Sequence, residues 1–392
     1  MKFLFVASLH HPPPSQAGSD PNDGEPATFP PSQGQHFWVR SLTKMGHTCH
    51  VFWRSASLWP WARTRALRMT ERPSAARALR ALSAPYSWIG LDPLWRNRRL
   101  MQHARELRPD VIVMIGGNDV ILPGTLDAIR RELRPVLVYA CGTSPVLFSH
   151  AIERQAATLY DLVVANDQYH AIQWLELGAP RAEVLPLSGV DPDFHRRRDP
   201  AWPDHGIAAC EIAFVGTLVP SRLYSRRVRA LEALREFDLA IWSVHEVPVS
   251  LRAAHRGPAL GEQMVQAIGS ASIVVNPHGD FMRYGGNMRL FEACGVGTMQ
   301  IVDDLPGVHR WFRVGTDLIT YHDVNELRDQ VAHYLSHPDE RRRIASAGQS
   351  HVYAHHTYDH RMARLVELVQ TIAESRKESP SPSDRGARPL PA

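Results

Sequence analysis

The stretch "YGGNMRLFEACGVGTMQIVDD" (residues 284–304) contains the features that decide the fold. Two glycines and an asparagine lead into an apolar helical run, and an apolar strand pattern follows from residue 298. One carboxylate, Glu292, lies within the helical run between Phe291 and Ala293. A buried carboxylate needs a partner, because removing an unpaired charge from water is costly. The stretch therefore predicts a loop, a helix and a strand, with Glu292 facing a partner.

The start of this predicted helix is a candidate anion site. We expect Asn287 to cap the helix and Gly295 to end it. First-turn amides are left unpaired at the positive end of a helix, where a phosphate binds well, and Arg283 and Arg289 flank that end. Glu292 lies about one and a half turns deeper, where a carboxylate can accept hydrogen bonds from the two hydroxyls of a ribose. Pairing of Glu292 with a neighbouring arginine is an equal alternative.

Short apolar runs alternate with helical patterns along most of the chain. The apolar runs of the first half are 2–8, 48–53, 110–115, 134–141, 161–166 and 182–187, and those of the second half are 210–216, 238–243, 272–277 and 298–304. This alternation is typical of an α/β protein whose parallel sheets are covered by helices on both faces. Because 392 residues are too many for one ordinary core, we predict two doubly wound units, joined by the Pro-, Asp- and Arg-rich segment 190–208.

The composition excludes several classes of protein. A formal net charge of +4 over 392 residues favours a small anionic ligand over nucleic acid. The four cysteines are far apart and form no CxxC pair, which argues against a zinc site and a disulfide framework. The chain shows neither a signal-peptide pattern nor an apolar run long enough to span a membrane. We therefore expect a cytoplasmic protein that binds no nucleic acid and no metal ion.

Two other loops are candidates for ligand contacts, because ligands of open α/β sheets bind beyond the carboxyl ends of the strands. In "FVGTLVPSR", Gly216 and Thr217 follow a strand pattern, and Arg222 offers charge to an anion, although an ordinary turn is an equal alternative. The Pro-rich segment 10–33 precedes Gly34 at a helix start. This second loop suits an acceptor site or a lid, and a disordered insertion is an equal alternative.

The segment 54–100 is rich in arginine and tryptophan. It suits either a surface for a lipid or aromatic acceptor, with peripheral membrane contact, or an amphipathic helical cover, which we favour. The chain contains no GxxxxGK[ST], GxGxxG or GxSxG motif. Kinase-like, dehydrogenase and α/β-hydrolase functions therefore lack their main supports.

The stretches "NMRLFEACGVGTMQIVDD" (287–304) and "YHDVNELRDQVAHYLSHPDERRRIASAGQSHVYAHHTYDHRMARLVELV" (321–369) resemble the carboxyl-terminal part of the spore-maturation-protein-like (CgeB-like) glycosyltransferases. These are similar to the broad GT-B, family-4-type glycosyltransferases. "FVGTLVPSR" (214–222) resembles their phosphate-loop strand, and "RAEVLPLSGVDPDFH" (181–195) resembles the end of their first domain. The amino-terminal half is similar only in its pattern of loop, helix and strand.

The resemblance implies a GT-B fold with two Rossmann-like domains facing across a cleft. Residues 1–195 would form an acceptor-side domain and residues 209–355 a nucleotide-sugar-binding domain, and the helix 356–375 would cross back to the first domain. The tail 377–392 contains too few apolar residues to pack and is predicted to be disordered. The implied reaction moves a sugar from a UDP- or GDP-linked donor, with retention and without a cofactor, to a glycan, lipid, protein or small-molecule acceptor.

The resemblance also assigns roles to residues. Glu292 would bind the ribose hydroxyls and Arg222 the diphosphate. The amides of Gly285, Gly286, Asn287 and Met288 would reach phosphate or donor sugar, with Gly34, Gly216, Thr217 and Arg289 as further donor-binding candidates.

Two departures from the family pattern leave other functions open. Tyr284 stands where a second glutamate often contacts the donor hexose, and Cys141 and Gly142 stand where a histidine or aspartate often follows the fourth strand. Asp119 and His36 are the substitute candidates for a catalytic role. A non-catalytic partner subunit and a nucleotide-sugar epimerase are the alternatives.

Overall fold

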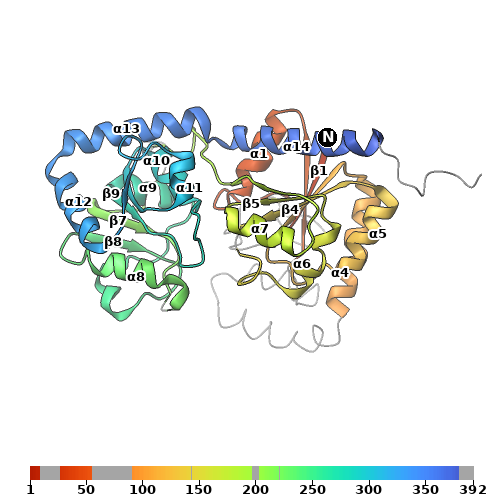
Figure 1. Cartoon of the computed structure of the whole chain (residues 1–392), viewed down its shortest axis with the longest axis horizontal. Helices are drawn as coiled ribbons and strands as arrows, with labels where there is room; N and C mark the ends of the chain where they lie inside the picture. Colours follow the sequence, from red (N-terminus) through yellow and green to blue (C-terminus); the bar gives the residue numbers. More distant parts are fainter. Residues whose placement is uncertain (9–26, 55–90, 143, 197–202, 220, 379–392) are drawn as a thin grey trace, which may run out of the picture.

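The computed structural model describes residues 1–8, 27–54, 91–142, 144–196, 203–219 and 221–378. Figure 1 shows two α/β units side by side, with two long carboxyl-terminal helices along one edge of both. These helices are α13 (Pro338–His355), which lies on the second unit, and α14 (Tyr358–Glu378), which lies on the first. The segment 55–90, which holds most of the predicted tryptophan-rich surface, lies outside the described residues, as do most of the Pro-rich loop and the tail from residue 379.

The first sheet is entirely parallel, with strand order β2-β1-β3-β4-β5-β6. Its strands are β1 (Lys2–Ala7), β2 (Thr48–Trp53), β3 (Val111–Ile115), β4 (Val136–Cys141), β5 (Leu162–Ala165) and β6 (Ala182–Val184). The described residues of this unit form the α-helices α1 (Gln35–Lys44), α4 (Leu91–Leu107), α5 (Pro123–Leu133), α6 (Ala151–Gln155) and α7 (Gln168–Glu176). Each strand lies within a predicted apolar run, because the interior strands of a parallel sheet are buried on both faces.

The second sheet is also parallel, with strand order β11-β10-β9-β7-β8. Its strands are β7 (Cys210–Val215), β8 (Leu239–Trp242), β9 (Ala271–Asn276), β10 (Met299–Asp303) and β11 (Ile319–Tyr321). Its helices are α8 (Ser225–Glu232), α9 (Glu262–Ser270), α10 (Arg289–Val296), α11 (Pro306–Trp311) and α12 (Val324–Ser336). β11 and α11 were not predicted, because three and six residues are too few to show a period.

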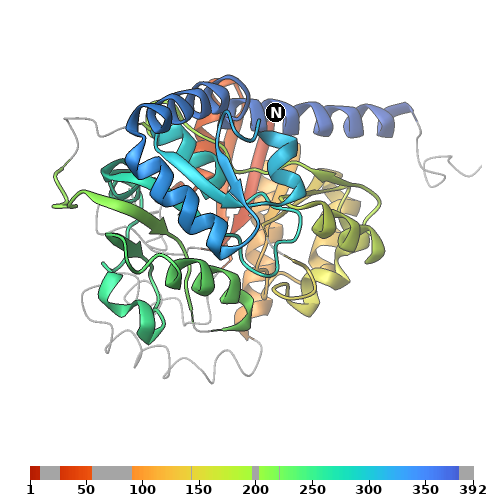
Figure 2. The ribbon, with the colours of Figure 1, turned by 60° about the vertical axis from the view of Figure 1, so that its left-hand side comes forward.

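The helix α14 belongs to the core of the first unit. Its residues Met362, Leu365 and Val369 are buried in one cluster with Phe3 and Phe5 of β1. In both views the blue carboxyl-terminal helix lies along the unit that contains the amino terminus (Figures 1 and 2). The chain therefore crosses between the units twice.

The two crossings lie against each other at the start of the segment 190–208, which was predicted to join the units. Val190 and His195 are buried, and Val190 exchanges main-chain hydrogen bonds with His356 and Tyr358. A side chain at Gly189 would come within 2.9 Å of the His356 carbonyl oxygen. The start of the predicted linker is thus part of the interior, because it pairs with the returning segment.

Candidate functional site

The loop before α10 is held by a pair of asparagines. The side-chain amides of Asn276, at the end of β9, and Asn287 exchange hydrogen bonds of 3.1 and 3.0 Å. The Asn287 Oδ1 atom also accepts a hydrogen bond of 2.9 Å from the Leu290 amide. Asn287 therefore caps the start of α10, as its sequence position predicts.

The end of α10 corrects one prediction. Gly297, and not Gly295, ends the helix, with φ of +79° in the left-handed region that favours glycine. Gly295 lies inside the helix, where a Cβ atom would come within 2.6 Å of Val190 and 3.2 Å of His195. Gly295 thus permits close packing of α10 on the crossing segment.

Glu292 is buried on α10 and has two partners. Its Oε2 atom lies 2.7 Å from Arg289 Nη1, and its Oε1 atom lies 3.8 Å from His195 Nε2. Burial alone would raise the pKa of Glu292, but Arg289 and His195 favour the carboxylate and lower the pKa overall. The arginine pairing left open by the sequence is therefore formed, and contact with a ribose stays a prediction.

The main-chain amides of residues 285–288, here called the glycine loop, differ in whether they already make a hydrogen bond. The Gly285 amide donates to Asp167 Oδ2 over 3.1 Å, and the Gly286 amide donates to His278 Nε2 over 3.2 Å. The amides of Asn287 and Met288 make no hydrogen bond with the described part of the chain. Of the four amides predicted to meet a phosphate, the last two are thus available to a ligand.

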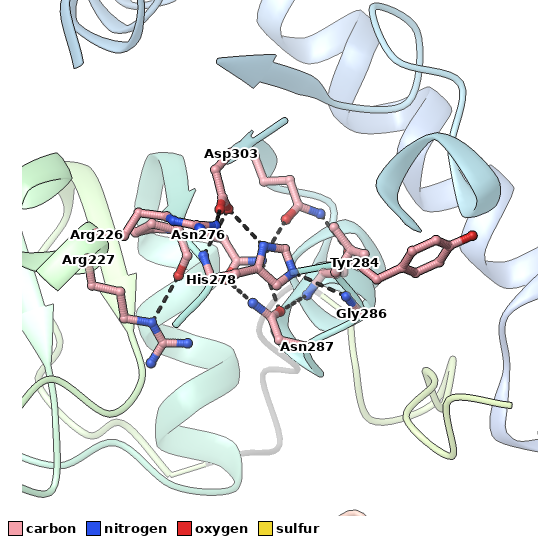
Figure 3. A network of polar contacts seen from close by, with 12 residues as sticks. Arg226, Arg227, Asn276, His278, Tyr284, Gly286, Asn287 and Asp303 are labelled. Carbon is pink, nitrogen blue, oxygen red and sulfur yellow. Dashed lines mark hydrogen bonds and ion pairs between the residues drawn. The ribbon is translucent and has the colours of Figure 1, made fainter. Parts of the chain in front are cut away.

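A buried chain of polar contacts orients this loop (Figure 3). Arg226 Nη1 lies 2.6 Å from Asp303 Oδ2, and His278 Nδ1 lies 2.7 Å from Asp303 Oδ1. Because the Gly286 amide donates to Nε2 of His278, the ring proton is on Nδ1 and is shared with Asp303. Burial would raise the pKa of Asp303, but His278 and Arg226 lower it to about 2. Asp303 is therefore ionised, and its charge is balanced by Arg226 within the network.

Arg227 joins two strand ends. Its Nε atom donates to the Pro277 carbonyl over 2.9 Å, and its Nη1 atom donates to the Thr217 carbonyl over 2.6 Å. Burial lowers the pKa of Arg227 to about 10. Gly216, a predicted donor-binding residue, is half-buried, and its amide donates a hydrogen bond to the Trp242 carbonyl.

Of the arginines that follow the β7 loop, Arg222 was predicted from the sequence to be a ligand of the diphosphate. Its side chain is exposed and makes no hydrogen bond or ion pair with a described residue, so its contact with a diphosphate stays a prediction. Arg226 and Arg227 were missed. Their position in the first turn of the helix after the β7 loop was the available signal.

The candidates of the first unit do not gather in one place. His36 Nδ1 is 2.9 Å from the Phe29 carbonyl oxygen, and Asp119 is exposed. Gly34, in contrast, faces the second unit, since a Cβ atom there would lie 3.1 Å from Met288 Cε. The loops of Gly34 and Met288, both predicted to bind the donor, therefore meet across the cleft.

A cavity of about 440 Å³ lies at this meeting point. It is situated at the carboxyl ends of β1, β3 and β4, and both Gly34 and Met288 line it. Trp38, Asn166 and Tyr358 also contribute to its wall, whereas His36 and Asp119 do not. This is the edge of a parallel sheet at which ligands of α/β proteins bind.

Asp167 ties the two units together beside the cavity. It is fully buried, and its Oδ1 atom caps α7 by accepting from the Tyr169 amide over 2.8 Å. Its Oδ2 atom accepts from the amides of Tyr284 and Gly285, over 2.9 and 3.1 Å. Sequence reasoning missed Asp167, although an aspartate between a strand and a helix is a recognisable cap signal.

Tyr284 takes part in the same contact. Its ring centroid lies 6.4 Å from that of Tyr169 and 6.3 Å from that of Trp311. Figure 3 shows the ring pointing away from the His278 network. The residue at the position of the second family glutamate is therefore used for packing between the units.

We expect Asp167→Asn to lower the free energy of unfolding by about 1–2 kcal/mol, because the NH2 group that replaces Oδ2 cannot accept from the amides of Tyr284 and Gly285. The Asn Oδ1 atom can still cap α7, so the loss reports the contact between the units. Urea denaturation measures it. Asp323→Asn is the matched control, since Asp323 caps α12 through the amides of Asn325 and Glu326 and is exposed. Equal losses in the two variants would contradict the prediction.

Two further properties concern the described residues. No group of three or more His, Cys, Asp or Glu side chains there is placed to hold a metal ion. None of the described helices is both long enough and apolar enough to cross a membrane.

Comparisons with known proteins agree with this geometry. Residues 225–367 match the glycosyl transferase-like family model. The spore protein CgeB of Bacillus subtilis (strain 168) is 25% identical over 278 residues, which are 67% of this chain and 83% of that protein.

Solved structures cover almost the whole chain. Anabaena Alr3699/HepE in complex with UDP-glucose aligns with a TM-score of 0.58 at 15% identity, covering 97% of this chain and all of that one. Sucrose-phosphate synthase of Thermosynechococcus elongatus aligns with a TM-score of 0.61 at 11% identity, covering 95% and 99%. At these identities the likeness is one of fold.

Proposed function

We propose that this chain, a glycosyltransferase of the GT-B fold, moves a sugar from a UDP-linked donor to an acceptor bound on the side of the first unit. The solved structures confirm the fold predicted from the sequence. The match of residues 225–367 to the glycosyl transferase-like family model supports the predicted enzyme class. The donor base is proposed from Alr3699/HepE, whose structures include complexes with UDP-glucose and with UDP.

The observation that carries this proposal is the cavity shared by the two units. Gly34 lines it from the first unit and Met288 from the second. The free amides of Asn287 and Met288 lie at the start of α10, and Glu292 follows within the same helix. An anion beside these amides would have its attached sugar within reach of a buried acid.

The chemistry required of this site is modest. Transfer releases a nucleoside diphosphate, so the main task is to stabilise the charge that grows on its phosphate oxygens. Fixed amides at a helix start and nearby arginines perform this task without a protein nucleophile. We propose that Glu292 leaves Arg289 to receive the ribose hydroxyls, that Arg289 and Arg222 supply positive charge to the diphosphate, and that transfer retains the configuration of the sugar without a cofactor.

A nucleotide screen tests the proposal. We expect UDP and UDP-linked sugars to raise the thermal midpoint, because a ligand of the folded state stabilises it by mass action. UDP release from the effective donor then measures turnover. Interconversion of the donor without UDP release would identify an epimerase, and UDP binding without any turnover would identify a non-catalytic subunit. A chain that binds neither UDP nor GDP, free or sugar-linked, would contradict the proposal.

A further inference from the structure

Tyr358 begins α14 at the point where the chain returns to the first unit. Its side chain is 1% exposed, and its ring stacks on Phe37 of α1 with centroids 5.1 Å apart and planes 17° apart. The ring is therefore fixed by packing, and the position of its hydroxyl group is fixed with it.

The proton of this hydroxyl group has no acceptor among the described residues. The Tyr358 hydroxyl has no hydrogen-bond partner among the described residues. The Gly189 amide faces the oxygen, but an amide donates and cannot accept the proton. Burying a hydroxyl without a partner is costly, and most buried polar groups avoid this cost. An acceptor supplied by a ligand would remove it.

The hydroxyl lies where the two units and the cavity meet. Tyr358 lines the cavity together with Gly34 and Met288, and a Cβ atom at Gly34 would lie 3.2 Å from the hydroxyl oxygen. Burial, and next the charge of Glu292, raise the pKa of Tyr358, while Arg289 acts in the opposite direction. The hydroxyl is therefore protonated at neutral pH and lies within electrostatic range of both side chains.

We propose that Tyr358 is a donor-binding residue, whose hydroxyl donates its unused proton to an oxygen of the nucleoside diphosphate held in the cavity. This inference rests on the proposed function, and it adds a residue of the returning helix to the site. It also gives the crossing of α14 a direct part in binding, because only that crossing brings the hydroxyl beside Gly34 and Met288.

Tyr358→Phe tests this role by removing one oxygen atom. We expect UDP to bind about tenfold more weakly, the effect of losing one hydrogen bond to a charged oxygen. Since the hydroxyl has no hydrogen-bond partner among the described residues, the thermal midpoint without ligand should stay the same or rise. A residue with a merely structural role would show no such separation of affinity from stability.

Tyr160→Phe is the matched control. Tyr160 is also fully buried with an unpartnered hydroxyl, but it packs against Tyr139 and Trp174 and does not line the cavity. Calorimetric titration with UDP should give the wild-type affinity for this control. Wild-type affinity in Tyr358→Phe, or a loss matched by a lower midpoint, would overturn the inference alone. Absence of UDP binding by the wild-type chain would overturn the UDP site and this inference together.

Discussion

Glu292→Ala should lower the rate of UDP release from the donor by at least about 100-fold, because two hydrogen bonds to a charged group are lost and each contributes about 1.5–3 kcal/mol. Glu292 is paired with Arg289, and we propose that the ribose hydroxyls take the place of this arginine. Glu292→Gln keeps the size of the side chain and one acceptor oxygen. We therefore expect a smaller loss of about tenfold from it.

Calorimetric titration with UDP and thermal melting separate the two possible roles of Glu292. If Glu292 only neutralises Arg289, Glu292→Gln will lower the melting midpoint and leave the UDP affinity unchanged, which would contradict our expectation. Glu153→Gln is the control. Glu153 is also a buried carboxylate, but it accepts from Tyr139 and from the amides of Asn118 and His150 within the first unit. This control should lose stability while keeping the UDP affinity.

Asp303→Ala should lower the free energy of unfolding by about 3 kcal/mol, as expected when one partner of a buried charged network is removed. The change leaves the ring N–H and the main-chain N–H of His278 without their acceptor in a fully buried site. Arg226 is 29% exposed and can turn to water, so most of the loss comes from His278. Urea denaturation at pH 7 measures the effect, and a loss below about 1 kcal/mol would contradict it.

The contribution of Asp303 also depends on pH, with a sign that follows from its pKa. The pKa is about 2 in the folded protein and 3.8 ordinarily, so folding favours the ionised form. The contribution is fully present above about pH 4 and is lost as the pH falls towards 2. The stability difference between the wild-type chain and Asp303→Ala should therefore shrink between pH 4 and pH 2. A difference that stays constant over this range would contradict the assignment.

The secondary structure of this protein follows from local sequence. The apolar runs of β1 and β7 are buried on both faces of a parallel sheet, and burial requires the apolar residues that make these runs visible. The cap of α10 by Asn287 is likewise local, since donor and acceptor are three residues apart. Two alternating α/β units, and the helix start that lies beside the cavity, were therefore predictable from the sequence.

The contacts between residues of the two units were not predictable from local sequence. Asp167 meets the amide of Tyr284 over a separation of 117 residues, and Tyr358 approaches Gly34 only because α14 returns to the first unit. A glycine at position 295 predicts a helix end, yet Gly295 lies inside α10, where it packs on Val190. Periodicity reports which face of an element is buried, but not which distant element covers that face. The sequence by itself determined most of the elements and the start of α10, whereas tertiary packing decided which side chains complete the site.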